Sequence, residues 1–424
     1  MTPEVKKRIE QIRQGIVPEG YVKDKDGIYP RDWASKKIGQ WLKLAERTIV
    51  LQDEEEYQLV TVRRGFGGVD SRGSFLGKNV LVKNYFIVKT GDFIISKRQI
   101  AHGACGIVPP ELDGAVVSNE YNVFLPQDGT NIQMFNLMMQ LPHYKRLFYL
   151  MSDGVHIEKL LFKTQDWMKR KLAMPLLKEQ KKIAEILSTQ DKTIELQGRK
   201  IEELKRFKKG CLEKMFPRKG QKVPEKRFPG FTDDWEQRKL TEFVEFFSGL
   251  TYTPNDVQEN GTLVLRSSNV SNGEVVDADN VYVNPQVVNS ENVKVGDIVV
   301  VVRNGSRSLI GKHAQIKAFM PNTVIGAFMT GIRSECPKFT NALLNTSRFE
   351  EEIAMNMGAT INQITGYMFS KMEFKVPCLD EQKEIGEYFE NLDNLITLHQ
   401  RKLEEMKKQK KALMQLLLTG IERV

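Results

Sequence analysis

The sequence predicts an α+β protein built as two mixed α/β domains, separated by two long helices that form an antiparallel coiled coil. Three observations predict this fold: an internal duplication, two proline-free stretches with a seven-residue apolar repeat, and β-branched runs typical of strands. Two similar helices in one chain can pair antiparallel, which would relate the two halves by a pseudo-two-fold axis.

The duplication is clearest in the segments that open the two helical stretches. Residues 175–216 and 377–418 align without a gap at an offset of 202 and share 17 identities in 42 positions. The same offset relates Trp33 to Trp235, and the Gly91-Asp92 turn has a counterpart in Gly296-Asp297. We therefore divide the chain into domain 1 (1–174), helix 1 (175–216), linker (217–230), domain 2 (231–376), and helix 2 with a tail (377–424).

The two variable domains contain short strands among polar turns. Residues 57–63, 263–266 and 298–302 are β-branched runs, and each Gly-Asp pair reads as a turn that enters a strand. The linker combines Pro217, Gly220 and Pro224 with several Lys and Arg residues, a composition typical of a break between domains.

The seam of the helices follows a heptad repeat. Its predicted apolar positions are Leu187, Ile194, Ile201, Leu204, Phe389, Ile396, Leu403 and Met406. Lys208 and Lys410 interrupt the seam at equivalent places, as polar residues do when they fix register. The alternative interpretation is that both helices serve only the core of a helical bundle.

Composition limits the classes of function. The 424 residues carry a net charge of +9, which favours a polyanionic partner such as nucleic acid. Four scattered cysteines predict neither a disulfide framework nor a zinc site. We expect a cytoplasmic protein without a membrane partner, because no run approaches the roughly 20 apolar residues that span a bilayer.

The sequence contains no recognisable motif of a DNA-modifying or DNA-cleaving enzyme. The sequence lacks a phosphate-binding G-x-x-x-x-G-K-[ST] loop and an amino-methyltransferase motif. Glu373-Phe-Lys375 matches the E-x-K triplet of many nucleases. The aspartate that usually precedes this triplet as a metal ligand is missing at the usual spacing, so we interpret the triplet as part of a strand. We therefore predict no catalytic residue, no bound cofactor and no metal site. A fused or stand-alone DNA nuclease or methyltransferase, and a coiled-coil scaffold without a DNA role, remain the alternatives.

The whole chain resembles the specificity subunit of type I restriction–modification systems. The resemblance rests on Pro175-Leu-Leu-Lys-Glu-Gln180 and Pro377-Cys-Leu-Asp-Glu-Gln382, which open the two equivalent helices, and on the tryptophans and Gly-Asp pairs above. Arg227-Phe-Pro-Gly-Phe231, which leads into the second half, supports it. Cys378 departs from the pattern, because a Leu or a small apolar residue usually follows the proline.

This resemblance implies a function and a set of partners. Each variable domain would be a target-recognition domain that reads one half of a bipartite site in double-stranded DNA, with the helices setting the spacing. Two methyltransferase subunits would dock on the chain and bring S-adenosylmethionine. Restriction motor-nuclease subunits would add translocation and cleavage that depend on ATP and Mg²⁺, and this chain would hold no cofactor.

Basic and amide side chains near predicted strand ends are the candidates for DNA contact, because phosphates require cations and base edges require planar donors. Arg63 and Arg266 are favoured because both end a predicted strand in comparable places. The full set of candidates is Arg63, Arg64, Arg72, Lys78, Lys97, Arg98, Arg266, Ser267, Asn269, Arg303, Asn304, Ser306, Arg307 and Lys312.

Overall fold

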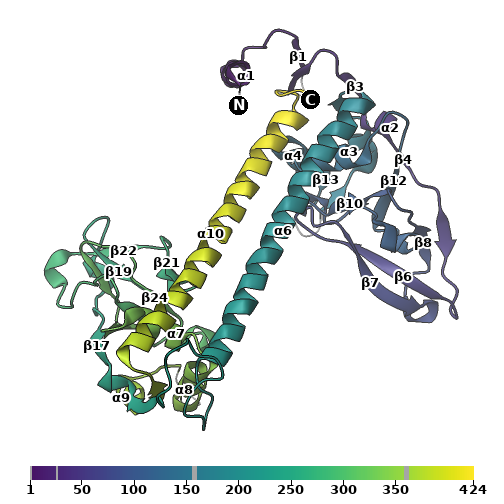
Figure 1. The fold of residues 1–424 in the computed structure, drawn as a ribbon. Helices are drawn as coiled ribbons and strands as arrows, with labels where there is room; N and C mark the ends of the chain where they lie inside the picture. The colour runs from purple at the N-terminus through teal and green to yellow at the C-terminus, as the bar shows by residue number, and fades with distance from the viewer. Residues whose placement is uncertain (1, 25–26, 155–159, 358–361) are drawn as a thin grey trace. The chain divides into compact units, whose positions relative to one another are not determined.

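The computed structural model describes residues 2–24, 27–154, 160–357 and 362–424 (Figure 1). The chain divides into two compact units. Unit 1 comprises Met1–Leu196 and Glu404–Val424, and unit 2 comprises Gln197–Leu403. Each unit therefore contains one variable domain together with part of each long helix.

Unit 1 is built around two sheets. The four-stranded sheet has the order β10 (Cys105–Ile107), β9 (Phe93–Ser96), β12 (Tyr121–Pro126), β4 (Leu42–Leu44). The five-stranded sheet has the order β5 (Thr48–Val50), β8 (Asn84–Ile87), β11 (Val116–Ser118), β6 (Glu56–Val62), β7 (Val69–Leu76). Three small ladders join β1 (Tyr21–Asp24) to β2 (Gly27–Pro30), β13 (Ser152–Asp153) to β14 (Leu161–Phe162), and β3 (Ala34–Lys37) to β15 (Lys171–Met174). The short helices are α1 (Pro3–Arg13), α2 (Ile38–Trp41), α3 (Ile132–Met139), α4 (Pro142–Leu150) and α5 (Thr164–Met168).

Unit 2 repeats this plan. Its first sheet has the order β17 (Val244–Ser248), β26 (Met329–Ser334), β23 (Ile298–Val301), β24 (His313–Gln315). Its second sheet has the order β18 (Val257–Gln258), β22 (Val281–Val283), β19 (Thr262–Leu265), β25 (Thr323–Ile325). The smaller ladders pair β16 (Glu236–Lys239) with β27 (Glu373–Val376) and β20 (Val270–Ser271) with β21 (Glu274–Val275). The short helices are α7 (Pro337–Leu344), α8 (Ser347–Asn356) and α9 (Gly366–Lys371).

The strand topology extends the duplication into the variable domains. Read from opposite ends, the four-stranded sheets share one order of equivalent strands, with β9 matching β23 and β12 matching β26. In each second sheet one pair is parallel, β6 with β11 and β19 with β25. The predicted strands at 57–63, 263–266 and 298–302 are confirmed to within a residue at each end as β6, β19 and β23. Glu373 and Lys375 lie in β27, as expected of a strand.

The repeated Gly-Asp turn has one construction in both units. The carboxylate of Asp92 accepts a hydrogen bond from Lys89 N and pairs with Arg47, whereas Asp297 accepts from Lys294 N and pairs with Arg333. Both glycines have a positive φ, 86° for Gly91 and 97° for Gly296, which only glycine adopts without strain. The motif therefore fixes the turn that precedes the central strand of each four-stranded sheet.

The long helices α6 (Leu177–Met215) and α10 (Leu379–Leu418) begin two residues after the repeated prolines. The Gln180 amide is fully buried; it accepts a hydrogen bond from Asn131 N and donates one to Pro175 O at 2.8 Å. Its equivalent Gln382 donates to Pro377 O at 2.9 Å. The repeated glutamine thus satisfies a backbone carbonyl at each proline and ties the helix to the chain that enters it.

The two helices pair antiparallel, as predicted. In unit 2, Gln197 Nε2 lies 2.8 Å from His399 Nδ1, and Lys208 Nζ lies 2.6 Å from Asp393 Oδ1. Residue numbers therefore rise along one helix while they fall along the other. In unit 1, Lys410 pairs with Asp191, the residues equivalent to Lys208 and Asp393 at the offset of 202.

Every residue of the predicted seam is at least partly shielded from solvent. Leu187, Ile201, Phe389 and Ile396 are buried, and the half-buried seam residues are Ile194, Leu204, Leu403 and Met406. The ends of the helices also enter the domain cores. Leu417 and Leu418 of α10 pack in the unit 1 core, and Leu212 and Met215 of α6 pack in the unit 2 core.

A glutamate at the start of each long helix is held by an arginine. Arg227 donates to both carboxylate oxygens of Glu381 at 2.7 Å, and Glu381 is fully buried. In unit 1, Arg423 donates to both oxygens of Glu179 and also to Asp32. Hydrogen bonding to Glu381 raises the pKa of Arg227, so the guanidinium stays charged across the physiological pH range.

We predict that Arg227→Ala lowers the free energy of unfolding by about 3–5 kcal/mol, because it leaves the buried Glu381 without its partner. Urea denaturation monitored by circular dichroism would measure the change. Arg238→Ala is the matched control, since Arg238 and Glu242 form a partly exposed pair at 3.8 Å and should contribute less than about 1 kcal/mol. Equal losses in the two variants would contradict a special role for Arg227.

Candidate nucleic-acid interface

In unit 2 three loops meet at one edge of the variable domain. They follow β19, follow β23, and connect β25 with β26. Gly326 N donates to Leu265 O, and Val302 N donates to Phe328 O. Hydrogen bonds between main chains therefore bring together loops that lie far apart in the sequence.

Four predicted residues gather at this edge. Arg266 and Ser267 follow β19, and Asn304 Nδ2 donates to Ser267 Oγ at 3.1 Å. The exposed Arg303 lies over the ring of Phe328, with the guanidinium carbon 5.0 Å from the ring centroid. The edge thus presents cations, an amide and a hydroxyl, the groups that contact phosphates and base edges.

Asn269, unlike these four residues, is not on the surface of the edge, because its side chain is fully buried. Its Oδ1 accepts from Arg266 N, and its Nδ2 donates to Ala278 O and to Asn280 Oδ1. The amide thus serves internal partners on two loop segments. This corrects its assignment as a DNA contact: the structure gives Asn269 a bracing role beneath the surface.

The remaining predicted residues of unit 2 lie further along the loop after β23. Ser306 and Arg307 are exposed, and Asn304 Oδ1 accepts from Ser306 N. Lys312 is half-buried, with its carbonyl accepting from Val301 N. His313 follows it at the start of β24, where burial lowers the pKa of the imidazole.

In unit 1 the candidates divide between two places. Arg63 and Arg64 form the turn of the β6–β7 ribbon, where Gly65 N donates to His102 O and Phe66 N to Gly103 O. This anchoring places the turn beside the loop that carries Lys97 and Arg98. Arg63 pairs with Asp70 across the turn, and Arg98 Nε donates to Glu120 at 2.7 Å.

Arg72 and Lys78 are not brought to that turn. Arg72 is exposed in the middle of β7, and Lys78 follows the end of the same strand, 3.8 Å from Glu54. Eight residues of strand separate the two ends of the ribbon, which at about 3.3 Å per residue is a substantial distance. The ribbon therefore spreads its cations along its length.

The loops after β9 and β23 are held in the same way in both units. Phe162 N donates to Lys97 O, and Ile364 N donates to Val302 O. In each case the donor follows a segment, 155–159 or 358–361, that lies outside the described residues. Sequence reasoning missed Phe328 and Asn362, which support the loop in unit 2, because only tertiary contacts place them there.

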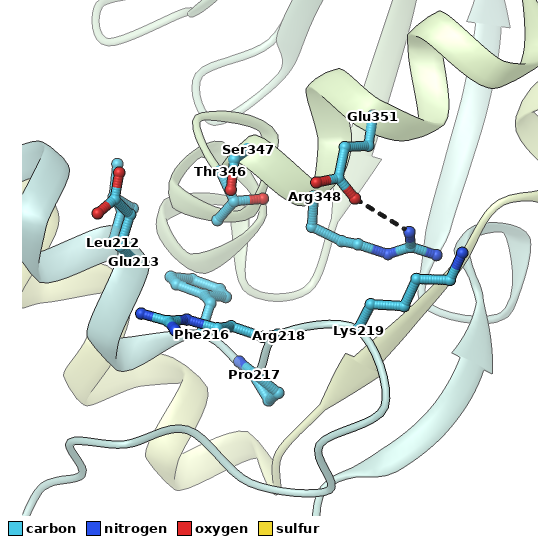
Figure 2. Close-up of a pocket in the computed structure, with 10 residues that line it drawn as sticks. All are labelled: Leu212, Glu213, Phe216, Pro217, Arg218, Lys219, Thr346, Ser347, Arg348 and Glu351. Atoms are coloured by element: carbon cyan, nitrogen blue, oxygen red, sulfur yellow. Dashed lines mark hydrogen bonds and ion pairs between the residues drawn. The ribbon is translucent and has the colours of Figure 1, made fainter.

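A hollow of 430 Å³ with basic residues in its lining lies in unit 2, where the end of α6 and the linker face the start of α8 (Figure 2). Arg218 and Lys219 line it with Arg348, whose guanidinium pairs with Glu351 and Glu352. These carboxylates neutralise Arg348, so the hollow is less cationic than its arginines and lysine suggest. Neither linker residue was among the predicted DNA contacts.

Within 2–24, 27–154, 160–357 and 362–424, no three His, Cys, Asp or Glu side chains cluster as metal ligands would. No helix in this described part has the length and apolar character needed to cross a membrane.

Two curated relatives match nearly the whole chain. The type I restriction enzyme MjaVIII specificity subunit of Methanocaldococcus jannaschii is 26% identical over 420 residues, covering 93% of this chain and 94% of the relative. The putative type I restriction enzyme MjaX specificity subunit of the same organism is 25% identical over 425 residues, covering 96% and 97%.

Solved structures show a similar fold. A chain from a type I restriction–modification system, solved in a study of complex assembly and conformational transition, covers 93% of this chain and 99% of its own length, with a TM-score of 0.59 and 16% identity. The type I S subunit from M. genitalium gives a TM-score of 0.56 at 14% identity, covering 91% of this chain and 96% of its own length.

The family profile described as the type I restriction modification DNA specificity domain matches residues 30–206 and 232–408. The two matches are offset by 202 residues, the offset of the duplication, and together they span most of the chain. The protein belongs to the family of type I restriction–modification DNA specificity domains, of which it carries two copies.

Proposed function

We propose that this chain is the sequence-specific DNA-binding subunit of a type I restriction–modification complex and reads a bipartite site. The observation that carries the proposal is the double occurrence of the specificity domain, with a basic residue directly after the equivalent strands β6 and β19. Each variable domain would read one half-site, and the paired helices would set the unread spacing between them.

The chemistry of the loop edges supports DNA rather than an acidic protein as the ligand. Exposed arginines provide phosphate contacts, whereas Ser267 and Asn304 offer hydrogen-bonding groups suited to base edges. Most charged residues at a protein–DNA interface position the protein, and a few planar donors specify sequence. Both kinds of residue occur at the edge of unit 2.

We expect the full chain to bind its target duplex tightly and with a steep dependence on salt. Fluorescence anisotropy at 50–200 mM salt would measure it; a protein with about 6–10 phosphate contacts loses about 10³–10⁵ in affinity over that range. The target would come from sequencing methylated positions in the host genome. Undetectable or salt-insensitive binding, even with methyltransferase subunits present, would favour a coiled-coil scaffold instead.

Modularity gives a second test of the bipartite proposal. Replacing residues 1–160 with those of a relative should change one half of the recognised sequence, because each half-site would be read by one domain. Methylated-site sequencing of the hybrid would reveal both halves. Simultaneous change of the two halves would contradict the assignment of one half-site to each domain.

Two methyltransferase subunits are the proposed partners of the helices. Leu398 is 63% exposed and Leu196 is 60% exposed, and these residues are equivalent at the offset of 202. Leu395 extends the apolar face of α10 beside Leu398, since residues three apart are neighbours on a helix. One surface that occurs twice suits two copies of one partner, and apolar exposure suits helix docking.

This assembly would supply the chemistry that the chain itself is proposed to lack. S-adenosylmethionine would be bound by the methyltransferase subunits, and ATP and Mg²⁺ by restriction motor-nuclease subunits. The chain would act by placing these partners on DNA. A purified chain that cleaved or methylated DNA unaided would instead support the nuclease or methyltransferase alternative.

We predict that Leu398→Glu weakens docking of one methyltransferase subunit, because a carboxylate would be desolvated at an apolar contact. Size-exclusion chromatography with light scattering should show a partner lost at limiting concentration, with unfolding stability unchanged. Glu405→Lys is a control at an exposed position of the same helix and should retain both partners. Full assembly of the Leu398→Glu chain would exclude this surface.

A further inference from the structure

The edge of unit 2 contains an open hollow of 690 Å³ beside Arg266. Leu250, Tyr252, Val257, Val281, Phe328 and Met329 provide its apolar lining. Ser267 and Asp279 line it as well. A volume of this size falls within the range of ligand sites, and such sites combine apolar walls with a few placed polar groups.

Arg266 is held in one orientation at the hollow. Its Nη2 donates to the main-chain oxygen of Asp279 and, at 2.8 Å, to the Oδ2 atom of the same residue. The Arg266 side chain is 32% exposed, and its Nε is sealed from solvent without a hydrogen-bond partner among the described residues. The guanidinium group of Arg266 is therefore fixed before any ligand binds, which reduces the conformational entropy lost on binding.

The loop that carries Asp279 is itself constrained. Asp279 has a φ of 50°, in the left-handed region that non-glycine residues seldom adopt. Buried Asn269 holds both partners, because it accepts from Arg266 N and donates to Ala278 O and Asn280 Oδ1. A partly exposed ion pair adds little to stability. The buried Asn269 amide and the unusual backbone of Asp279 therefore maintain an Arg266–Asp279 ion pair that contributes little to stability.

We propose that Arg266 reads a guanine in the half-site of the second domain, with Asp279 as its positioning residue and the hollow receiving the base edge. This inference rests on the proposed function and identifies the specificity-determining residue within it. The contacts to Asp279 use Nη2, which leaves Nη1 free among the described residues, and one N–H of Nη1 can be shared between the adjacent O6 and N7 acceptors of guanine. The apolar walls exclude water from these hydrogen bonds and so strengthen them.

The hollow also explains why the guanine contact would be selective. Phe328 closes one side, and Arg303 over its ring adds a cation near the phosphates without entering the hollow's lining. An adenine at the same position would oppose an N6 amino donor to the Nη1 donors of Arg266. A donor facing a donor in a partly desolvated pocket is unfavourable, so Arg266 would reject adenine as well as select guanine.

The test pairs a change in the protein with a change in one DNA atom. Anisotropy titrations of the full chain would use its target duplex and duplexes carrying 7-deazaguanine, which lacks the N7 acceptor, at each guanine of the second half-site. We expect Arg266→Ala to weaken target binding about 5- to 150-fold. One 7-deazaguanine position should weaken the wild-type chain but have no added effect on Arg266→Ala.

Asp279→Asn should relax base preference at that same position while leaving the melting temperature nearly unchanged, because the partly exposed pair adds little to stability. Ala327→Leu would fill the hollow from its exposed rim and should also weaken specific binding. Ala318→Leu, at an exposed position outside the hollow's lining, and Arg238→Ala are the controls and should bind as the wild type does.

Two outcomes would overturn the proposal. In the first, Arg266→Ala weakens all duplexes equally, which would make Arg266 a phosphate contact. In the second, 7-deazaguanine has no effect at any position of the second half-site. Both leave the wild-type chain binding its target specifically, so they differ from a failure of the proposed function, in which the wild-type chain itself would show no preference.

Discussion

The core of each unit depends on helix ends that come from both copies of the duplication. Leu417 and Leu418, near the end of the chain, pack with Ile183 and Leu187 in the core of unit 1. Leu212 and Met215, which belong to the first copy in sequence, pack with Phe389 in the core of unit 2. The paired helices are therefore integral to both hydrophobic cores, and changing their pairing register would disturb the packing of both domains.

Charged residues in the seam make that register specific. Lys208 with Asp393, and Lys410 with Asp191, are half-shielded pairs at equivalent positions of the duplication. A shift by one helical turn would leave each lysine without its aspartate in a partly desolvated place, which costs more than the pair itself contributes. Apolar residues alone would tolerate such a shift better, because one leucine packs much like another. The lysines that interrupt the heptad therefore select one alignment.

The features predictable from sequence are those with a local or periodic signal. The duplication, both long helices and the strands β6, β19 and β23 follow from identity, heptad spacing and β-branched runs. The role of Asn269 could not be found this way, because its burial depends on contacts with Ala278 and Asn280, nine and eleven residues further along the chain. Arg227 and Arg423 hold equivalent glutamates yet are offset by 196 residues, so an alignment at 202 does not relate them.

The same framework presents different chemistry in the two units. Arg63 follows β6 and Arg266 follows β19, and these two strands are equivalent. The Gly-Asp turns that precede β9 and β23 are equivalent as well. In unit 1, β6 continues into the long β6–β7 ribbon, which distributes arginines along an extended arm. In unit 2, β19 leads to the short β20–β21 hairpin and the hollow beside Arg266. Because the core and helices fix the strands, loops can diverge without loss of the fold, and two copies of one domain can read two different sequences.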